Sequence, residues 1–278
     1  MTMGERIWFI TGISSGIGQA LAEVAMAAGE YVIGTFRGKG EVMAFNKRHK
    51  GKGTAILLDV TDYDAIENVV ATIKQQYGRI DVLVNNAGMG FVGAIEETSL
   101  AEAKRVFEVN FFGTMKLTQE VLPLMREQKK GHIVQISSHG GIKAFAGFGM
   151  YNASKFALEG MSEALAQEVA PLGIKLSIVE PGPFRTGFAG SRLVEADQRI
   201  DDYSATAGTF RSKLKGVDGS QEGNPKKAAE AILGLVNDQS PTLRMPLGKT
   251  ALVTIGMKLD SVRKDLETHR TTAEKAVY

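Results

Sequence analysis

The 278-residue chain contains no cysteine, and this absence excludes several kinds of chemistry at once. Disulfide bonds, thiolate nucleophiles, iron–sulfur ligation and cysteine-based zinc sites all require that residue. The four histidines are scattered without the spacing of metal ligands, so no metal site is predicted. An excess of charge is also missing. The 33 basic and 31 acidic residues leave a net charge of +2, which does not favour nucleic acid as a partner.

Long apolar runs are absent as well. None approaches the roughly 18 residues that a membrane-spanning helix needs, and the first residues lack the features of a signal peptide. We therefore expect a cytoplasmic protein without a membrane partner. Hydrophobic residues still make up 44% of the chain, which excludes a disordered protein and supports a large core.

Short apolar runs alternate with segments of helical spacing. Most of the runs are continuous, which is typical of parallel strands covered on both faces. This alternation predicts an α/β fold, a Rossmann-type doubly wound parallel β-sheet with helices on both faces, in a single domain over residues 1–278. The predicted strands are 7–10, 31–33, 55–58, 82–84, 133–136 and 176–179.

Two later segments depart from this pattern. Residues 187–224 are rich in small and charged residues, and we expect a mobile insertion that acts as a substrate lid. Helical spacing returns at the C-terminus and predicts a helical extension over about 249–267.

A glycine-rich turn, Thr11-Gly12-Ile13-Ser14-Ser15-Gly16-Ile17-Gly18, joins the first strand to a helix. Glycines let such a turn approach a pyrophosphate at the helix N-terminus. The same residues contain the G-x-S-x-G pattern of a hydrolase, with Ser14 as nucleophile. Chain order disfavours this alternative, because a nucleophile elbow normally follows several strands. A bare turn without a ligand is the third interpretation.

Tyr151 and Lys155 are four residues apart and share one face of a predicted helix. An unperturbed phenol keeps its proton up to about pH 10. An ammonium about 4 Å away, at an effective dielectric near 20, stabilises the phenolate by up to about 4 kcal/mol, roughly three pKa units. The pair can therefore transfer protons near neutral pH.

Six motifs occur together in a fixed order: the glycine-rich turn, Asn85-Asn86-Ala87-Gly88, Asn110, Ser138, the Tyr151/Lys155 pair and Pro181-Gly182. Over residues 5–190 this set closely resembles the short-chain dehydrogenase/reductase (SDR) family. The 13-residue step from Ser138 to Tyr151 is also that family's usual one. The resemblance implies an oxidoreductase that interconverts a ketone or aldehyde and its alcohol, by hydride transfer with a nicotinamide cofactor.

The resemblance also implies roles for single residues. Tyr151 is similar to the general acid/base, Ser138 to the hydroxyl that polarises the carbonyl, and Lys155 to the lysine that lowers the tyrosine pKa and binds ribose. Asn110 matches the asparagine that holds a relay water; alternatively it bonds its own helix backbone. Asp59 resembles the adenine contact but could equally cap the next helix. The cofactor-binding positions so implied are Gly12, Ser14, Ser15, Gly16, Ile17, Gly18, Asp59, Val60, Asn86, Ala87, Gly88, Tyr151, Lys155, Pro181, Gly182 and Thr186.

The residues at the end of the second predicted strand indicate which cofactor the protein prefers. A carboxylate there binds both ribose hydroxyls and selects NAD, but no acid lies between Glu30 and Glu41. Arg37 offers a planar fork suited to a 2′-phosphate, and Ser14 can donate a further bond. Alternatively, Arg37 is only an exposed loop residue and Phe36 packs on the adenine. The sequence predicts NADP(H) in preference to NAD(H).

Apolar residues flank the predicted motifs, and they favour a small apolar carbonyl or alcohol as substrate. Some are expected in the core and the rest in a pocket wall. A competing interpretation is a catalytically silent dinucleotide-binding sensor or scaffold, which the intact Ser138, Tyr151 and Lys155 disfavour. The resemblance further implies a homo-oligomer, a dimer or a tetramer. The flanking residues are Met89, Phe91, Phe145, Phe148, Met150, Phe184 and Phe188.

Overall fold

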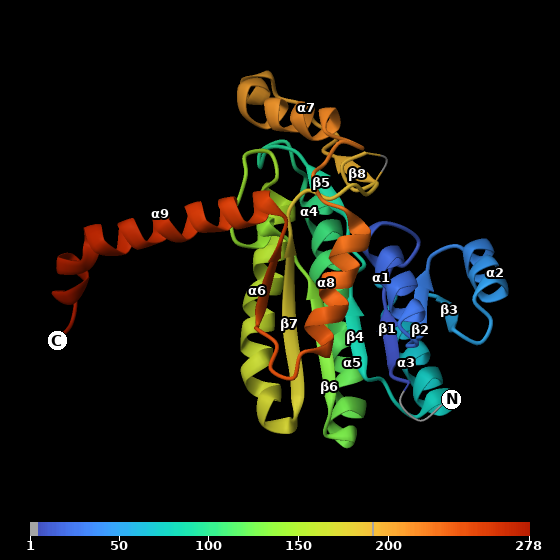
Figure 1. The fold of residues 1–278 in the computed structure, drawn as a ribbon. Coiled ribbons are helices and arrows are strands. Elements are labelled where there is room, and N and C mark those ends of the chain that lie inside the picture. The colour runs from blue at the N-terminus through green and yellow to red at the C-terminus, as the bar shows by residue number, and fades with distance from the viewer. Residues whose placement is uncertain (1–4, 191) are drawn as a thin grey trace.

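A parallel sheet forms the centre of the protein in the computed structural model, which describes residues 5–190 and 192–278 (Figure 1). Each strand pairs with its neighbours in parallel. This arrangement confirms the predicted Rossmann-type α/β fold. In their order across the sheet, the seven strands are β3 (Gly53–Leu57), β2 (Tyr31–Phe36), β1 (Ile7–Ile10), β4 (Val82–Asn85), β6 (Gly131–Ile136), β7 (Ile174–Pro181) and β9 (Arg244–Leu247).

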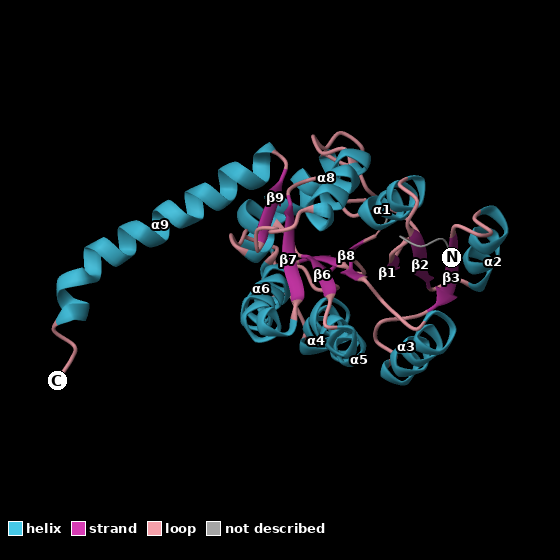
Figure 2. Cartoon of the chain, turned by 60° about the horizontal axis from the view of Figure 1, so that its bottom comes forward, coloured by secondary structure: helices cyan, strands magenta, loops and turns pink. Residues whose placement is uncertain are grey.

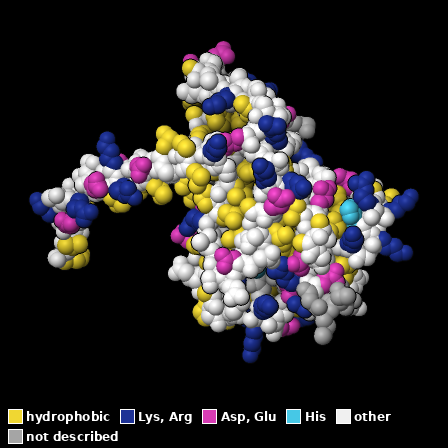
Figure 3. Space-filling view, in the orientation of Figure 1, with side chains coloured by type: hydrophobic (Ala, Val, Ile, Leu, Met, Phe, Trp, Pro, Cys, Tyr) yellow, Lys and Arg dark blue, Asp and Glu magenta, His cyan; other side chains and the backbone are white. Residues whose placement is uncertain are grey.

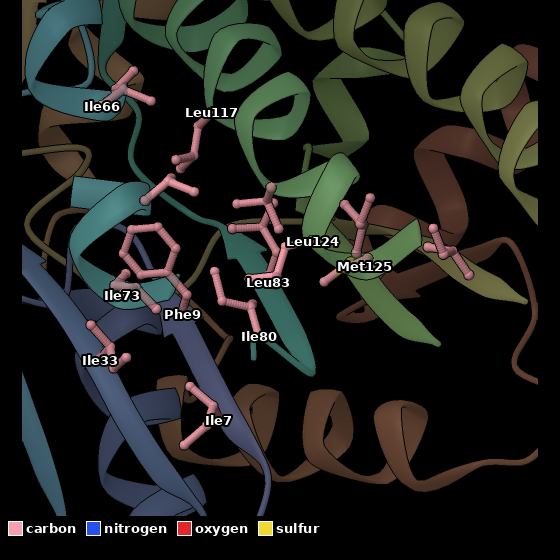
Figure 4. Packing of buried hydrophobic residues seen from close by; sticks show 14 of the residues in the cluster. Ile7, Phe9, Ile33, Ile66, Ile73, Ile80, Leu83, Leu117, Leu124 and Met125 are labelled. Atoms are coloured by element: carbon pink, nitrogen blue, oxygen red, sulfur yellow. The ribbon is translucent and has the colours of Figure 1, made fainter. Parts of the chain in front are cut away.

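Helices cover both faces of the sheet (Figure 2). On one face, Ile73 of α3 and Leu117 of α5 share a buried cluster with Phe9 of β1 (Figure 4). On the other face, Leu21 of α1 and Ile232 of α8 belong to a second buried cluster. The strands are apolar on both sides because both sides are covered. The helices are α1 (Gly16–Ala27), α2 (Lys39–Arg48), α3 (Tyr63–Tyr77), α4 (Leu100–Phe107), α5 (Gly113–Gln128), α6 (Gly149–Val169), α7 (Thr209–Gly216), α8 (Pro225–Asn237) and α9 (Lys249–Glu274).

The edge strand β9 is not predicted by the sequence pattern. It has only four residues, all of intermediate burial, and one of them is Pro246. Proline cannot donate to a sheet ladder and is confined to positions such as an edge strand. The sheet therefore contains one strand more than the apolar runs indicate.

The segment 187–224 also has more regular structure than the sequence suggests. Its strand β8 (Leu193–Glu195) pairs in parallel with β5 (Gly90–Val92), and α7 follows. Arg211 of α7 forms a partly buried ion pair with Glu97 at 2.8 Å. The segment lies beyond the carboxyl ends of the central strands (Figure 1). Residues distant in the chain hold these elements, so local spacing does not reveal them.

The C-terminal helix α9 projects from the body of the protein (Figures 1 and 2). A helical extension is expected here, and the structure carries it on to Glu274. Ala251 in its first turn is buried, and Thr254 Oγ1 lies 2.9 Å from Nδ1 of His139. Among residues 5–190 and 192–278, no helix combines the length and apolarity needed to cross a membrane.

Gly18 provides a test of the packing around the glycine-rich turn. A Cβ atom there would lie 2.3 Å from Nδ2 of Asn86 and 2.6 Å from the carbonyl oxygen of Gly12. We expect Gly18→Ala to lower the free energy of unfolding by about 1–3 kcal/mol, measured by urea denaturation. Gly160→Ala in α6 is the matched control, because its Cβ meets nothing within 4 Å. The control should gain about 0.5–1 kcal/mol. Equal effects of the two substitutions would contradict this packing.

Candidate active site

Hydrogen bonds from two neighbouring strands hold the glycine-rich turn in place. Nδ2 of Asn86 donates to the carbonyl oxygens of Thr11, at 2.9 Å, and Gly12, at 3.0 Å. Oγ1 of Thr11 accepts from the backbone N–H groups of Asn86, at 3.0 Å, and Ala87, at 2.9 Å. The N–H of Gly12 donates to Oγ1 of Thr35 at 3.0 Å. The Asn86 side chain, predicted at the cofactor site, thus positions the turn itself.

The turn presents the N-terminus of α1 as an anion site. Gly16 has a φ of +64°, a left-handed conformation that glycine adopts without strain. The side chain of Ser15 makes no capping hydrogen bond among the described residues, so it does not occupy the amides of the first turn. Exposed amides and the positive end of a helix attract phosphate. These residues therefore fit the pyrophosphate of a dinucleotide.

The predicted residues that follow β7 meet this turn. A Cβ on Gly16 would lie 3.1 Å from Cγ2 of Thr186, so the Thr186 side chain rests against the turn. Pro181 ends β7, and the N–H of Gly182 donates to the carbonyl oxygen of Leu247 in β9 at 2.8 Å. The structure thus brings Thr186 against Gly16 at one edge of the sheet, although the two residues belong to motifs that are distant in the sequence.

Arg37 is exposed directly after β2, whereas Phe36 before it is buried. Phe36 is only 8% exposed, and its ring centroid lies 5.6 Å from that of Phe45. The ring thus belongs largely to the core, and the alternative in which Phe36 packs on the adenine stays a prediction. The N–H of Ile13 donates to the carbonyl oxygen of Thr35 at 3.1 Å, which ties the glycine-rich turn to this end of β2.

Asp59 and Val60 follow β3 along the same edge. The exposed Asp59 accepts from the N–H of Thr61 at 3.0 Å and from its hydroxyl at 2.9 Å, and Val60 is buried. Helix α3 is capped by Asp62, whose carboxylate accepts from the N–H of Ala65 at 3.0 Å. The alternative that Asp59 caps this helix is therefore wrong, because Asp62 takes that position. An adenine contact by Asp59 stays a prediction.

Asn110 lies in a π-helical turn, Glu108–Phe112, between α4 and α5. Its Oδ1 accepts from the N–H of Met89 at 2.8 Å. Its Nδ2 donates to the carbonyl oxygen of Met89 at 3.0 Å and to Oγ of Ser154 at 3.1 Å. These partners lie on other segments, so the alternative that Asn110 bonds its own helix is wrong. Single π turns are frequent at functional sites, where they redirect a side chain.

Tyr151 and Ser138 meet at the start of α6. Tyr151 is 5% exposed, and burial raises the pKa of its phenol to about 12, an effect that a hydrogen bond with Ser138 partly offsets. Oγ of Ser138 accepts from the N–H of Gly140 at 3.0 Å, which fixes the serine side chain. The phenol consequently keeps its proton at neutral pH.

Lys155 is buried one turn further along α6. Its Nζ donates to the carbonyl oxygen of Ile136 at the end of β6, at 2.8 Å. A Cβ on Gly88 would lie 3.8 Å from this Nζ and 3.3 Å from Oδ1 of Asn110, so Gly88 leaves room beside both groups. Burial lowers the pKa of Lys155 to about 8.

The direction of the Tyr151 pKa shift differs from the sequence-based expectation. The spacing of Tyr151 and Lys155 predicts that the ammonium lowers the phenol pKa, yet the pKa is raised. The cause is desolvation, which disfavours the phenolate in a buried site. Sequence spacing places the two residues on one face but does not give their burial.

Aromatic rings surround Tyr151. Phe148 stacks on it with a centroid distance of 4.4 Å, and Phe188 approaches edge-on at 5.4 Å. Phe210 of α7 lies 5.4 Å from Phe148 and 5.9 Å from Phe145. Of the seven predicted flanking residues, Phe145, Phe148 and Phe188 therefore gather at the phenol. Met89, Phe91 and Met150 belong to a separate cluster, and Phe184 lies against Gly223. Phe210 was missing from the prediction because it lies far from every motif in the sequence.

The histidines give no support to a serine hydrolase at Ser14. Two of them are buried and bond elsewhere: Nε2 of His132 lies 3.0 Å from Oγ of Ser177, and Nδ1 of His139 bonds Thr254. Burial lowers the pKa of His132 to about 4 and also lowers that of His139. Both are therefore neutral at pH 7 and bonded away from the glycine-rich turn. His139, which follows Ser138 in the chain, joins the site to α9 through its bond to Thr254.

A buried charge cluster lies behind Lys155, and the sequence reasoning did not find it. Nε of Arg244 in β9 lies 3.3 Å from Glu159 in α6 and 3.2 Å from Glu180 in β7. Burial raises the pKa of both carboxyls, that of Glu180 to about 7. Glu159 follows Lys155 by one helical turn and favours the charged form of the ammonium. The signal in the sequence was an acid inside the apolar run of β7.

The comparisons with known proteins agree with this geometry. The profile of the short chain dehydrogenase family matches residues 6–196. Oxidoreductase BOA17 of Botryotinia fuckeliana is 38% identical, over 90% of this chain and 92% of its own. A 3-ketodihydrosphingosine reductase of Bacteroides thetaiotaomicron is 39% identical, over 88% and 89%.

Solved structures extend the likeness to the whole chain. The crystal structure of a short-chain dehydrogenase from Streptomyces avermitilis has a TM-score of 0.94 and 43% identity, with 100% of both chains covered. ElxO with NADP bound has a TM-score of 0.74 and 25% identity, over 90% of this chain and 99% of its own. A Burkholderia phymatum structure in complex with NAD has a TM-score of 0.83 at 22% identity, over 95% and 96%, and shows the fold alone.

The buried charge cluster predicts a pH dependence of stability. Glu180 is 1% exposed, and its folded pKa of about 7 lies above the ordinary value of 4.5. Between these values the folded state holds a proton that the unfolded state has lost, so stability falls as pH rises, by up to about 1.4 kcal/mol per pH unit. We expect Glu180→Gln to gain stability relative to the unmodified protein between pH 5 and 7.5, measured by urea denaturation.

The control is Glu163→Gln, because Glu163 contacts the same arginine at 3.4 Å but is largely exposed. Its difference from the unmodified protein should stay nearly constant with pH. His132, whose pKa burial lowers to about 4, gives stability a pH dependence of the opposite sign. This contribution cancels in the comparison of the variants with the unmodified protein, since all of them retain His132. If the difference in the free energy of unfolding between Glu180→Gln and the unmodified protein does not change with pH, the raised pKa of Glu180 is contradicted.

Proposed function

The chain belongs to the short-chain dehydrogenase family, and on this premise we propose that it is an NADP(H)-dependent oxidoreductase for a hydrophobic ketone or aldehyde and its alcohol. The observation that carries the proposal is the buried Tyr151 phenol beside Ser138, with Lys155 one helical turn away and aromatic rings around it. A bound nicotinamide would supply or accept hydride. The side chains supply the proton and the orientation.

Tyr151 is the proton donor in the direction of reduction. Its pKa of about 12 keeps the phenol protonated at neutral pH, ready to donate to the substrate oxygen. Oγ of Ser138 accepts from the N–H of Gly140, and on substrate binding its hydroxyl hydrogen would turn to polarise the same oxygen. The two donors act on the charge that develops on that oxygen.

Lys155 stabilises the phenolate that remains after proton transfer. One of its three N–H groups is bonded to the carbonyl oxygen of Ile136, and the others are available for ribose hydroxyls and the proton path. Asn110 lies beside Lys155, across Gly88, and is proposed to hold a water that returns the proton. Its bonds to Met89 and Ser154 fix its side chain for this task.

The glycine-rich turn and the end of β2 are proposed to hold the adenosine half of NADP(H). The turn presents the N-terminus of α1 to the pyrophosphate. Arg37 is exposed at the end of β2, and the bond from Ile13 to Thr35 keeps Ser14 near that end. A guanidinium and a hydroxyl suit a 2′-phosphate, which a carboxylate at this place would repel.

The substrate is proposed to be apolar and to bind against the aromatic rings. Phe148 and Phe188 flank the phenol, and Phe188 and Phe210 come from the segment 187–224. A substrate that reaches Tyr151 must pass these rings, so we propose that the segment opens and closes as a lid. One relative is by name a reductase of a keto compound, 3-ketodihydrosphingosine, which agrees with a ketone substrate.

Tyr151→Phe tests the catalytic assignment. The substitution removes the transferable proton and keeps the ring, so NADPH-dependent turnover of a ketone should fall at least about 100-fold. Reduced-nicotinamide absorbance measures turnover, and NADPH affinity should change little. Tyr63→Phe, at an exposed tyrosine of α3, is the control and should retain full activity. Near-normal turnover by Tyr151→Phe would refute the role.

NADPH binding without turnover of any ketone by the unmodified protein would favour the silent-sensor alternative.

Arg37→Ala tests the cofactor preference. Charge-assisted bonds of about 1.5–3 kcal/mol correspond to roughly 10- to 150-fold discrimination. The ratio of kcat/KM for NADPH to that for NADH should therefore fall by this factor. Lys39→Ala, an exposed cation two residues further on, is the matched control and should change the ratio little. An unmodified protein that uses NADH equally well or better would overturn the NADP(H) assignment and leave the oxidoreductase assignment standing.

A further inference from the structure

Asn152 of α6 has no task in the reaction proposed above, yet its side chain makes two bonds close to the phenol. The residue is 1% exposed, so it lies beneath the surface drawn in Figure 3 and must find its partners within the protein. Nδ2 donates to the carbonyl oxygen of Gly140 at 2.8 Å, and Oδ1 accepts from the N–H of Phe145 at 3.0 Å. One amide thus holds two points of the loop 137–148, which joins β6 to α6 and carries Ser138.

A side-chain amide suits this pair of partners. The carbonyl oxygen of Gly140 requires a donor and the N–H of Phe145 requires an acceptor, so the partners determine which end of the Asn152 amide faces each of them. An ionised carboxylate in its place could only accept. An aliphatic side chain would leave both backbone groups without this partner, and an unpaired buried backbone group is costly.

Gly140 connects the Asn152 amide to the serine of the proposed reaction. Its N–H donates to Oγ of Ser138 at 3.0 Å, while its carbonyl oxygen accepts from Asn152. A Cβ on Gly140 would lie 2.7 Å from Nδ2 of Asn152, 3.2 Å from Oγ of Ser138 and 3.5 Å from Cε1 of Tyr151, so only glycine fits between these side chains. Glycine also has more backbone freedom than any other residue, so the loop needs an anchor at this place. The Asn152 amide provides that anchor.

We propose that Asn152 is a positioning residue for ketone reduction, which acts through Gly140 to hold the Ser138 hydroxyl beside the Tyr151 phenol. This inference rests on the function proposed above. Asn152→Ala removes the anchor and lets the residue that bonds Ser138 move. A displacement of about 1 Å at a reacting group can cost about 100-fold in rate. We therefore expect kcat/KM for a ketone to fall about 10- to 100-fold in this variant.

A double-mutant cycle on kcat/KM of the full chain separates positioning from general destabilisation. If Asn152 acts through Ser138, Asn152→Ala should cost little further activity once Ser138→Ala has removed the hydroxyl. A merely structural defect would lower kcat/KM by the same factor in both backgrounds, and that result would overturn this inference alone. Full activity of Ser138→Ala would overturn the proposed role of the serine, and this inference with it. If Asn152→Ala does not fold, Asn152→Ser repeats the cycle, because its hydroxyl can still bond one of the two backbone groups.

Asn46 of α2 offers a matched control beside the edge strand β3. Its Nδ2 donates to the carbonyl oxygen of Ala55 at 3.2 Å and its Oδ1 accepts from the N–H of Ala55 at 2.6 Å, so Asn46→Ala removes the same pair of bonds elsewhere. This variant should lose stability to urea and keep its turnover, and a loss of turnover equal to that of Asn152→Ala would contradict the proposal.

Hydrogen exchange tests the anchor without any substrate. The Gly140 amide should exchange faster in Asn152→Ala than in the unmodified protein, because the residue is released, and should not change in Asn46→Ala. An unchanged exchange rate at Gly140 in Asn152→Ala would overturn the proposal, whether or not a ketone is turned over.

Discussion

The burial of Tyr151 and Lys155 is the constraint on which the site depends. Water is excluded from both groups, so the phenol keeps its proton and the ammonium gives up its proton near pH 8. The carbonyl oxygen of Ile136 accepts from the ammonium, and Glu159 favours its charge from one turn further along α6. A buried ammonium without such partners would be strongly destabilising. The charge cluster around Arg244 therefore belongs to the same arrangement.

The parallel sheet explains why these groups meet. The carboxyl ends of β1, β2, β4, β6 and β7 lie along one edge, and each contributes a turn to the site. Side chains that cross between turns make the edge one unit: Asn86 holds the glycine-rich turn, and Asn110 holds the backbone at Met89. The proposed dinucleotide site and the proposed proton donor thus share one frame, and the segment 187–224 lies beyond this edge (Figure 1).

Much of this could be predicted from the sequence, because it depends on short-range patterns. The apolar runs, the glycine-rich turn and the Tyr151/Lys155 spacing each lie within a few residues, and the fold and the family are confirmed. The features that were missed depend on contacts between distant segments. Strand β9 and the position of Phe210 have no local signature, and in the Arg244 cluster only Glu180 gives one. The spacing of Tyr151 and Lys155 predicts a lowered phenol pKa, because it indicates that the two groups are close. It does not indicate that the phenol is buried, and burial raises the pKa.

The pH profile of ketone reduction by the unmodified protein tests the account most directly. Reduction by this site requires a protonated Tyr151 phenol to donate and a charged Lys155 to stabilise the phenolate that follows. With NADPH and an apolar ketone chosen by screening, turnover should stay level up to about pH 8 and then fall as Lys155 loses its proton. Turnover that rises through pH 8, or stays level up to the ordinary lysine pKa of 10.5, would contradict it.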